Sequence, residues 1–208
     1  MAKIYILGAS GSGKTTLARN LSSLLHVPHY DLDKIGLEKG LVTEDDAFAI
    51  AGQPRWISEG CYLIWTDPLL YQADCIVLLE VPWPVATWRI IRRHIMKSLH
   101  GTNPYPGVNG AKLLFNLIKD MRRHSLNKVD PNTPLAECMS RYLEKQKESA
   151  VPPTPESVGR DVEKYLTISV PPTAEFLRRY LEKYQEKVFL VRNNADRERL
   201  LELLTRHL

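Results

Sequence analysis

The strongest constraint on the fold is a glycine-rich loop between an apolar run and an amphipathic segment. Residues 8–15 read Gly-Ala-Ser-Gly-Ser-Gly-Lys-Thr and match the pattern G-x-x-x-x-G-K-[ST] in full. Residues 3–7 have the composition of a buried strand, and residues 14–25 have the apolar spacing of a helix. The loop therefore predicts a strand–loop–helix unit that binds phosphate.

The residue types in this loop are those that bind the phosphates of a nucleotide. Glycines let successive backbone N–H groups point inward and cradle phosphate oxygens, and the positive end of the helix dipole adds to the attraction. We expect Lys14 to reach the β- and γ-phosphates of ATP and the Thr15 hydroxyl to ligate Mg²⁺. The nucleotide-binding residues predicted around the loop are Gly8, Ser10, Gly11, Ser12, Gly13, Lys14, Thr15 and Thr16.

The rest of the chain alternates between strand-like and helix-like segments. Strands are predicted at residues 29–33, 55–58, 75–81 and 187–191, and helices at 44–51, 69–73, 84–99, 110–124 and 195–207. Such alternation favours a parallel sheet covered by helices on both faces. The predicted fold is an α/β three-layer sandwich of the P-loop NTPase class, with five parallel strands and a helical insert.

Composition narrows the class of protein. The chain has 208 residues, which allows one domain, and its three Cys are far apart, so we expect no disulfide framework and a cytoplasmic location. No stretch approaches the ~18 apolar residues of a membrane span, so no membrane partner is expected. The net charge of +4 is too mild, as a total, to indicate a nucleic-acid binder.

The distribution of charge is more informative than its total. Residues 84–128 contain nine Lys and Arg against one acid, Asp120, so this segment carries +8 and the remaining chain −4. Its first helix is predicted to have an apolar face of Trp88, Ile91, Ile95 and Leu99 and a basic stripe of Arg89, Arg92, Arg93 and Lys97. Its second helix is predicted to turn Leu114, Leu117, Ile118 and Met121 inward.

Several stretches together resemble the bacterial DNA topology modulation protein family. They are the P-loop with its strand, His29-Tyr30-Asp31-Leu32-Asp33, Trp56-Ile57-Ser58-Glu59-Gly60, and Ala73-Asp74-Cys75 leading into the apolar strand and the Arg-rich helix. The resemblance covers residues 1 to about 125 and 187–208. Members look like adenylate and shikimate kinases, which implies the strand order 2-3-1-4-5 and a small-molecule or nucleotide kinase.

Two aspartates follow Pro28 in the predicted second strand. Side chains two apart on a strand share a face, so Asp31 and Asp33 can point at one site. The resemblance implies that Asp31 lies near the metal and that Asp33 binds the acceptor hydroxyl or acts as its base. The alternative is a solvated turn or a helix cap before Ile35.

A third carboxylate ends the strand that should lie beside the P-loop strand. Glu59 then has the Walker B position and is predicted to hold Mg²⁺ through water, while Gly60 allows close approach of the acceptor. Cys61-Tyr62-Leu63 follow, where family members often carry a small polar residue and an Arg, so the acceptor contacts are expected to differ. Glu80 ends another apolar run and is the competing Walker B candidate.

Arginines supply the predicted cations for the moving phosphoryl group. Arg89 and Arg93 lie where nucleotide kinases place a lid, and a guanidinium fork holds phosphate oxygens bidentately, although an exposed helix face is the alternative. Arg122 and Arg123 are predicted to bind an anionic acceptor. Arg192 and Asn193, after the last strand, are predicted to contact adenine. Asn194 belongs to the same loop, but it is equally well explained as the cap of the final helix.

Residues 133–184 contain a repeat with an offset of 19 residues. Val151-Pro-Pro-Thr-Pro-Glu and Val170-Pro-Pro-Thr-Ala-Glu open two copies, and Thr133-Pro134 opens a third, each leading into a short helix. We expect the helices to pack through Met139/Leu143, Val158/Val162 and Leu177/Leu181. The insert is either structurally inert or a cover for the substrate site or an oligomer contact.

These features predict one P-loop domain over residues 1–208, with a lid-like segment at 84–128 and the insert at 129–186. The predicted function is an ATP- and Mg²⁺-dependent phosphotransferase acting on a small-molecule or nucleoside-monophosphate acceptor. The alternatives are a nucleotide-dependent nucleic-acid-binding or regulatory protein, with the basic segment on a phosphate backbone, and an ATPase without an acceptor.

Overall fold

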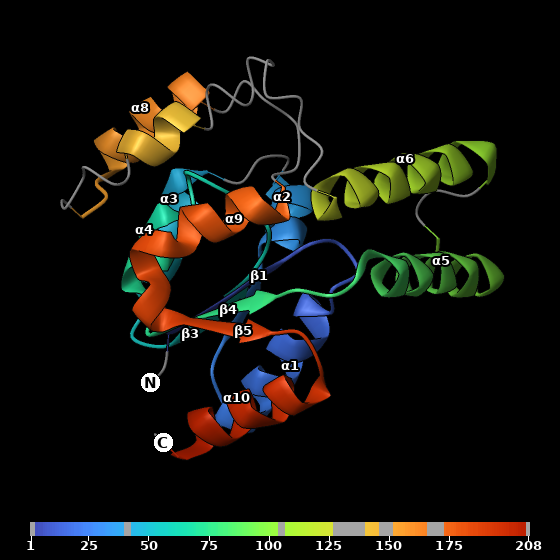
Figure 1. Cartoon of the computed structure of the whole chain (residues 1–208), viewed down its shortest axis with the longest axis horizontal. Helices are drawn as coiled ribbons and strands as arrows, with labels where there is room; N and C mark the ends of the chain where they lie inside the picture. Colours follow the sequence, from blue (N-terminus) through green and yellow to red (C-terminus); the bar gives the residue numbers. More distant parts are fainter. Residues whose placement is uncertain are drawn as a thin grey trace.

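Five parallel strands form one sheet in the order β2-β3-β1-β4-β5 (Figure 1). The computed structural model describes residues 3–39, 43–103, 107–126, 140–145, 152–165 and 173–206. The strands are β1 (Lys3–Gly8), β2 (His29–Asp31), β3 (Trp56–Glu59), β4 (Cys75–Leu79) and β5 (Val188–Val191). The predicted α/β fold and strand order are therefore confirmed.

Side chains of β1 alternate between two apolar layers, one on each face of the sheet. Ile4 and Ile6 pack with α1 (Lys14–Leu25) and α10 (Asn194–Arg206), and Tyr5 and Leu7 pack with the opposite layer. That layer contains α3 (Glu44–Ala51), α4 (Asp67–Gln72) and α9 (Ala174–Leu181), followed by the 3₁₀ helix η1 (Glu182–Lys187). Both faces of the sheet are covered, as all-parallel sheets require.

The predicted second strand is two residues too long. β2 ends at Asp31, which pairs with the last residue of β3, Glu59, and α2 (Leu32–Lys39) starts at the next residue. The chain turns there because β3 offers no further partner and because Leu32 is fully buried in the core. The prediction that Asp31 and Asp33 share one strand face is wrong, since Asp33 lies in the first turn of α2.

The basic segment is a pair of long helices, α5 (Trp83–Leu99) and α6 (Gly107–Ser125), which lie side by side and project from the sheet (Figure 1). They pack at their base through Ala86, Ile90 and Met121. Trp88, by contrast, is 64% exposed and Leu99 76% exposed, so the predicted apolar face does not form the packing face. The inner face of α5 consists of smaller residues because it lies against the P-loop.

The repeat region contains a helical segment at 140–145 and the helices α8 (Pro155–Tyr165) and α9. The side chain of Thr173 accepts a hydrogen bond from the Phe176 N–H, and that of Thr154 accepts one from the Ser157 N–H, so both threonines cap helices that begin where the repeat predicts. Val158, Leu177 and Leu181 are buried in the main core. Met139 and the side chain of Val162 lie outside what the structure describes.

Among the described helices, none combines the length and the apolar character needed to cross a bilayer.

Candidate active site

The P-loop joins β1 to α1 and is held against the start of α5. Gly11 has a φ of +75°, and a Cβ at this position would lie 2.7 Å from the carbonyl oxygen of Ala86 and 2.9 Å from Cγ1 of Ile90. Gly11 therefore serves both the left-handed turn and the close approach of α5. Gly13, with a φ of +101°, precedes the first residue of α1.

Two cations converge on this loop. The Lys14 ammonium is buried and donates a hydrogen bond to the carbonyl oxygen of Ala9 at 3.3 Å. Nη1 of Arg89 donates to the carbonyl oxygens of Ser12 at 3.1 Å and Gly11 at 3.5 Å. The base of the lid-like segment thus lies on the phosphate-binding loop, and the backbone carbonyls hold both positive groups beside the N–H groups that would face phosphate.

Glu59 lies behind the loop, in the centre of the sheet's carboxyl edge. Its Cα pairs with Ile6 of β1 on one side and with Asp31 of β2 on the other. The side chain is almost fully buried, and burial raises the pKa of Glu59, although a hydrogen bond from the Thr15 hydroxyl opposes this rise. One carboxylate oxygen, Oε1, is buried without a hydrogen-bond partner among the described residues.

These oxygen donors fit a magnesium ion. The Thr15 hydroxyl, Oε1 of Glu59 and the neighbouring Asp31 carboxylate are hard ligands of the kind Mg²⁺ prefers, although Nε2 of His29 lies 3.8 Å from that Oε1. In the described part of the chain, no group of three His, Cys, Asp or Glu side chains is arranged to hold a metal unaided. A metal here would therefore depend on phosphate oxygens and water for most of its coordination. Asp31 also accepts a hydrogen bond from the Lys34 N–H at 3.0 Å. It therefore caps α2, as the alternative explanation of this residue predicted.

A cavity of about 200 Å³ opens between the P-loop and α6, and we call it the Asp33 cavity. It brings Lys14 and Asp33 together, although Asp33 comes from a helix rather than from the predicted strand. Oδ1 of Asp33 accepts a hydrogen bond from the Tyr62 hydroxyl at 2.7 Å. The residues that line the cavity are Ala9, Ser10, Lys14, Asp33, Cys61, Tyr62, Leu117, Asp120 and Met121.

Tyr62 is a site residue that the sequence did not single out. Burial and the hydrogen bond to Asp33 raise the pKa of the Tyr62 phenol, so the hydroxyl stays protonated and donates to the carboxylate. The Tyr62 ring also fills the space beside Gly60, where a Cβ would lie 3.0 Å from Cδ2 of that ring. A glycine is therefore needed at position 60 because the Tyr62 ring of this chain approaches it closely, whereas the sequence predicted close approach by the acceptor.

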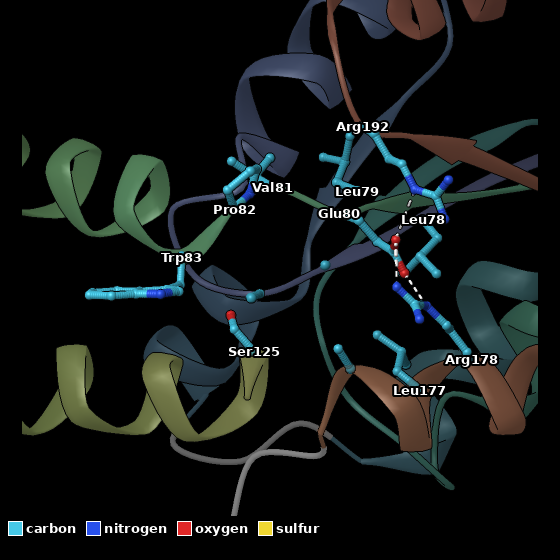
Figure 2. A pocket seen from close by; sticks show the side chains of 13 residues that line it. Leu78, Leu79, Glu80, Val81, Pro82, Trp83, Ser125, Leu177, Arg178 and Arg192 are labelled. Carbon is cyan, nitrogen blue, oxygen red and sulfur yellow. Dashed lines mark hydrogen bonds and ion pairs between the residues drawn. The ribbon is translucent and has the colours of Figure 1, made fainter. Parts of the chain in front are cut away.

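A second cavity, of about 380 Å³, lies on the other side of the P-loop, and we call it the Glu80 cavity (Figure 2). Glu80 accepts hydrogen bonds from Nε of Arg178 at 2.5 Å and Nη2 of Arg178 at 2.9 Å, and from Nε of Arg192 at 3.2 Å. Burial disfavours the charge on Glu80, but the two guanidinium groups outweigh it and lower the pKa of the carboxyl group. Trp83 and Leu177 form apolar parts of the wall, and Ala9 lines both cavities.

The remaining predicted residues lie outside the two cavities, with Arg192 the exception. The Arg122 guanidinium stands 5.9 Å from the centre of the Trp83 ring, and Arg123 pairs with Asp120 at 3.9 Å. Arg93 is exposed and makes no hydrogen bond or ion pair with any described residue. Asn193, rather than Asn194, caps α10, because its Oδ1 accepts a hydrogen bond from the Asp196 N–H at 2.9 Å.

Similarity to known proteins is confined to distant solved structures. Models of known families and curated proteins gave no match to the sequence. Among solved structures, shikimate kinase from Acinetobacter baumannii in complex with shikimate matches at 20% identity and a TM-score of 0.40, over 72% of this chain and 96% of that one. Shikimate kinase from Aquifex aeolicus matches at 16% and 0.35, over 69% and 95%.

A gluconokinase from Sinorhizobium meliloti matches at 16% identity and a TM-score of 0.35, over 64% of this chain and 78% of that one. At such identities and scores, the activity of these proteins does not transfer to this chain. The fold assignment rests on the strand order together with the P-loop between β1 and α1.

Proposed function

We propose that this chain is an ATP- and Mg²⁺-dependent phosphotransferase that phosphorylates a hydroxyl group of a small molecule. The observation that carries the proposal is the Asp33 cavity, where the P-loop ammonium of Lys14 and a carboxylate, Asp33, line the same space of about 200 Å³. A phosphoryl group at the P-loop and a hydroxyl group at Asp33 would lie close enough for in-line transfer.

The roles of the residues follow from their chemistry. Asp33 would accept a hydrogen bond from the acceptor hydroxyl and take its proton as the oxygen attacks the γ-phosphorus. The Tyr62 hydroxyl donates to Oδ1 of Asp33, which leaves Oδ2 for the acceptor and fixes the direction of the carboxylate. Lys14, Arg89 and Arg93 would stabilise the negative charge on the transferring group.

Thr15 and Glu59, with Asp31 beside them, would hold Mg²⁺, which neutralises charge on the phosphate oxygens. Glu80 is a weaker candidate for this role because two arginines already satisfy its carboxylate. The nucleoside end of ATP would lie towards the β4–β5 side, near Arg192 and Asn193. The motif resemblance to the DNA topology modulation family supports the same general assignment to a P-loop kinase.

The lining of the Asp33 cavity narrows the acceptor class. Two carboxylates, Asp33 and Asp120, face the cavity, and neither Arg122 nor Arg123 lines it. Its volume lies below the usual range of about 300–1,000 Å³ for ligand pockets. We therefore favour a compact acceptor that is uncharged or carries an amino group over an anionic one such as a nucleoside monophosphate.

An acceptor screen tests the proposal. ADP release is measured with ATP, Mg²⁺ and panels of polyols, sugars, amino alcohols, hydroxy acids and nucleoside monophosphates, each beside a Lys14→Ala control. We expect stimulation by a compound of the first three panels and none in the control. The proposal fails if no acceptor raises ADP release while a nucleic-acid duplex binds tightly at physiological salt, because the basic segment would then serve a phosphate backbone.

A further inference from the structure

The outer face of α5 exposes a row of large apolar side chains. Val85, Trp88, Ile95 and Leu99 recur at the spacing of one helix face and are 42%, 64%, 49% and 76% exposed. They lie within 15 residues, which rise about 21 Å along the helix. Isolated apolar residues on a surface are ordinary, but four large ones on a single helix face, interrupted only by Arg92, indicate an interaction surface.

Movement of α5 towards the P-loop cannot bury this row. The inner face of the helix is made by Ala86 and Ile90, which are buried against Gly11 and α6. On a helical wheel the midpoint of this inner pair is roughly opposite the outer row. Closure of the hairpin over a nucleotide would therefore press the inner face down and leave the outer face in water.

The far end of the hairpin is apolar on both helices. Leu99 is the last residue of α5, and Val108, the second residue of α6, is 85% exposed. Phe115, two turns further along α6, is 67% exposed. The tip, the end remote from the P-loop, thus presents hydrocarbon without using any residue that lines the Asp33 or Glu80 cavity.

Basic side chains lie among these apolar ones. Arg92 falls within the outer row of α5, and Lys97 and Lys112 are exposed near the tip. Residues 84–128 carry +8, whereas the rest of the chain carries −4. A partner for this face must therefore offer negative charge and a place for hydrocarbon at the same time.

We propose that the outer row of α5 and the tip of the hairpin dock on an anionic membrane surface. Such a surface presents negative headgroups to Lys and Arg and hydrocarbon to Trp88, Leu99 and Val108. A nucleic-acid backbone would leave the apolar tip in water, and a second copy would bring two segments of +8 together. The contact is peripheral and needs no helix that spans the bilayer.

Vesicle co-sedimentation of the full chain tests the proposal. Vesicles of phosphatidylcholine with 30% phosphatidylglycerol are compared with vesicles of phosphatidylcholine alone, at low and physiological salt. We expect binding to the anionic vesicles that weakens with salt, because each basic residue near the surface contributes roughly fivefold to partitioning. We also expect a blue shift of tryptophan emission that is absent in Trp88→Phe, since Trp56 and Trp65 are already buried and the half-buried Trp83 lines the Glu80 cavity rather than the outer row.

Two pairs of substitutions separate the apolar and basic contributions. Ile95→Ser with Leu99→Ser should weaken binding by roughly tenfold or more, and Lys97→Gln with Lys112→Gln by roughly 25-fold. Leu24→Ser, which changes an exposed leucine of α1, is the matched control and should bind like the wild type. All of these positions are exposed, so melting temperatures should stay close to the wild-type value.

Three results would overturn the proposal. The first is equal or absent binding to the two kinds of vesicle by the folded wild type. The second is binding of a DNA duplex that the Ile95/Leu99 pair does not weaken, with no vesicle binding. The third is a concentration-dependent dimer that the same pair dissociates, which would assign the outer row to a second copy.

Discussion

Asp67 gives the fold a pH dependence that a single substitution should remove. It is the first residue of α4, is 8% exposed, and accepts hydrogen bonds from the hydroxyls of Tyr142 and Tyr180. These tyrosines occupy the same position in two copies of the 19-residue repeat. One buried carboxylate therefore ties two parts of the repeat region to the core.

The magnitude follows from the environment of this carboxylate. Burial raises the pKa of Asp67 from 3.8 to about 6, with the Asp161 carboxylate adding to the rise and the two hydroxyls and Lys183 opposing it. Between pH 4 and 6 the folded chain then binds more protons here than the unfolded chain does, so stability falls as pH rises through this window. At about 1.4 kcal/mol per pK unit, the loss from this group is about 3 kcal/mol.

Asp67→Asn should remove this component, because the amide does not titrate. Urea unfolding of both proteins at several pH values from 4 to 7.5 measures the free energy of unfolding. We expect the variant to lose stability relative to the wild type at pH 4, through imperfect hydrogen bonding, and to recover about 2.5 kcal/mol of that difference by pH 7, since the unfolded carboxyl group is already mostly ionised at pH 4. Asp45→Asn, at an exposed aspartate in α3, is the control and should follow the wild type in pH dependence.

A difference between Asp67→Asn and the wild type that stays constant from pH 4 to 7.5 would refute this reasoning. Tyr142→Phe provides a second measurement. This substitution removes a hydrogen bond that favours the charged form of Asp67, so the pKa of Asp67 should rise further. The fall in stability with pH should then extend further towards neutral pH.

Three further predictions concern the P-loop site. Lys14→Ala should lower acceptor-dependent turnover by roughly 100-fold or more while the melting temperature in the absence of ATP stays close to the wild-type value; an undiminished rate would remove Lys14 from the site. Glu59→Gln should raise the Mg²⁺ concentration for half-maximal turnover by roughly 10–100-fold and Glu80→Gln by less than about twofold, and the reverse pattern would assign the metal to Glu80. Gly11→Ala should destabilise the fold by about 2–4 kcal/mol in urea unfolding, since a φ of +75° is strained for alanine and its Cβ would lie 2.7 Å from Ala86 O; a cost below about 0.5 kcal/mol would mean that α5 shifts freely.

The parts of the fold that were predicted correctly depend on local patterns. The P-loop, its strand and its helix are adjacent in sequence, and the alternation of apolar runs with amphipathic segments predicts the parallel sheet. The starts of the helices near Thr154 and Thr173 were likewise predicted from the repeat, and each threonine accepts a hydrogen bond from an N–H only three residues away. The position of Glu59 beside the P-loop strand followed from the strand order that the family resemblance implied, and its pairing with Ile6 confirms that position.

The parts that were missed depend on contacts between distant residues. The end of β2 is set by the length of β3, so the strand stops at Asp31 and Asp33 falls in a helix. The bond between Tyr62 and Asp33 joins residues 29 apart, and the partners of Asp67 come from 75 and 113 residues away. The periodicity of apolar residues along the chain cannot predict contacts between residues so far apart in the sequence.

The exposed face of α5 was misjudged for a different reason. The helix has two apolar faces, a narrow one with Ala86 and Ile90 and a larger one with Trp88 and Leu99. Hydrophobicity favours the larger face for packing, but only the narrow one allows the helix to approach the backbone of Gly11. Closeness to the P-loop therefore decided which face was buried.

The most direct test of the central claim is acceptor-stimulated ADP formation by wild type and Asp33→Asn, with ATP affinity measured for both. Asp33 lines the Asp33 cavity with Lys14 but belongs to α2 rather than to the P-loop, so its substitution should affect the acceptor rather than ATP. We predict that Asp33→Asn binds ATP like the wild type and loses acceptor-dependent turnover by roughly 100–10,000-fold, as expected for loss of a general base. Equal acceptor-dependent rates in the two proteins would contradict the claim that phosphoryl transfer takes place in this cavity.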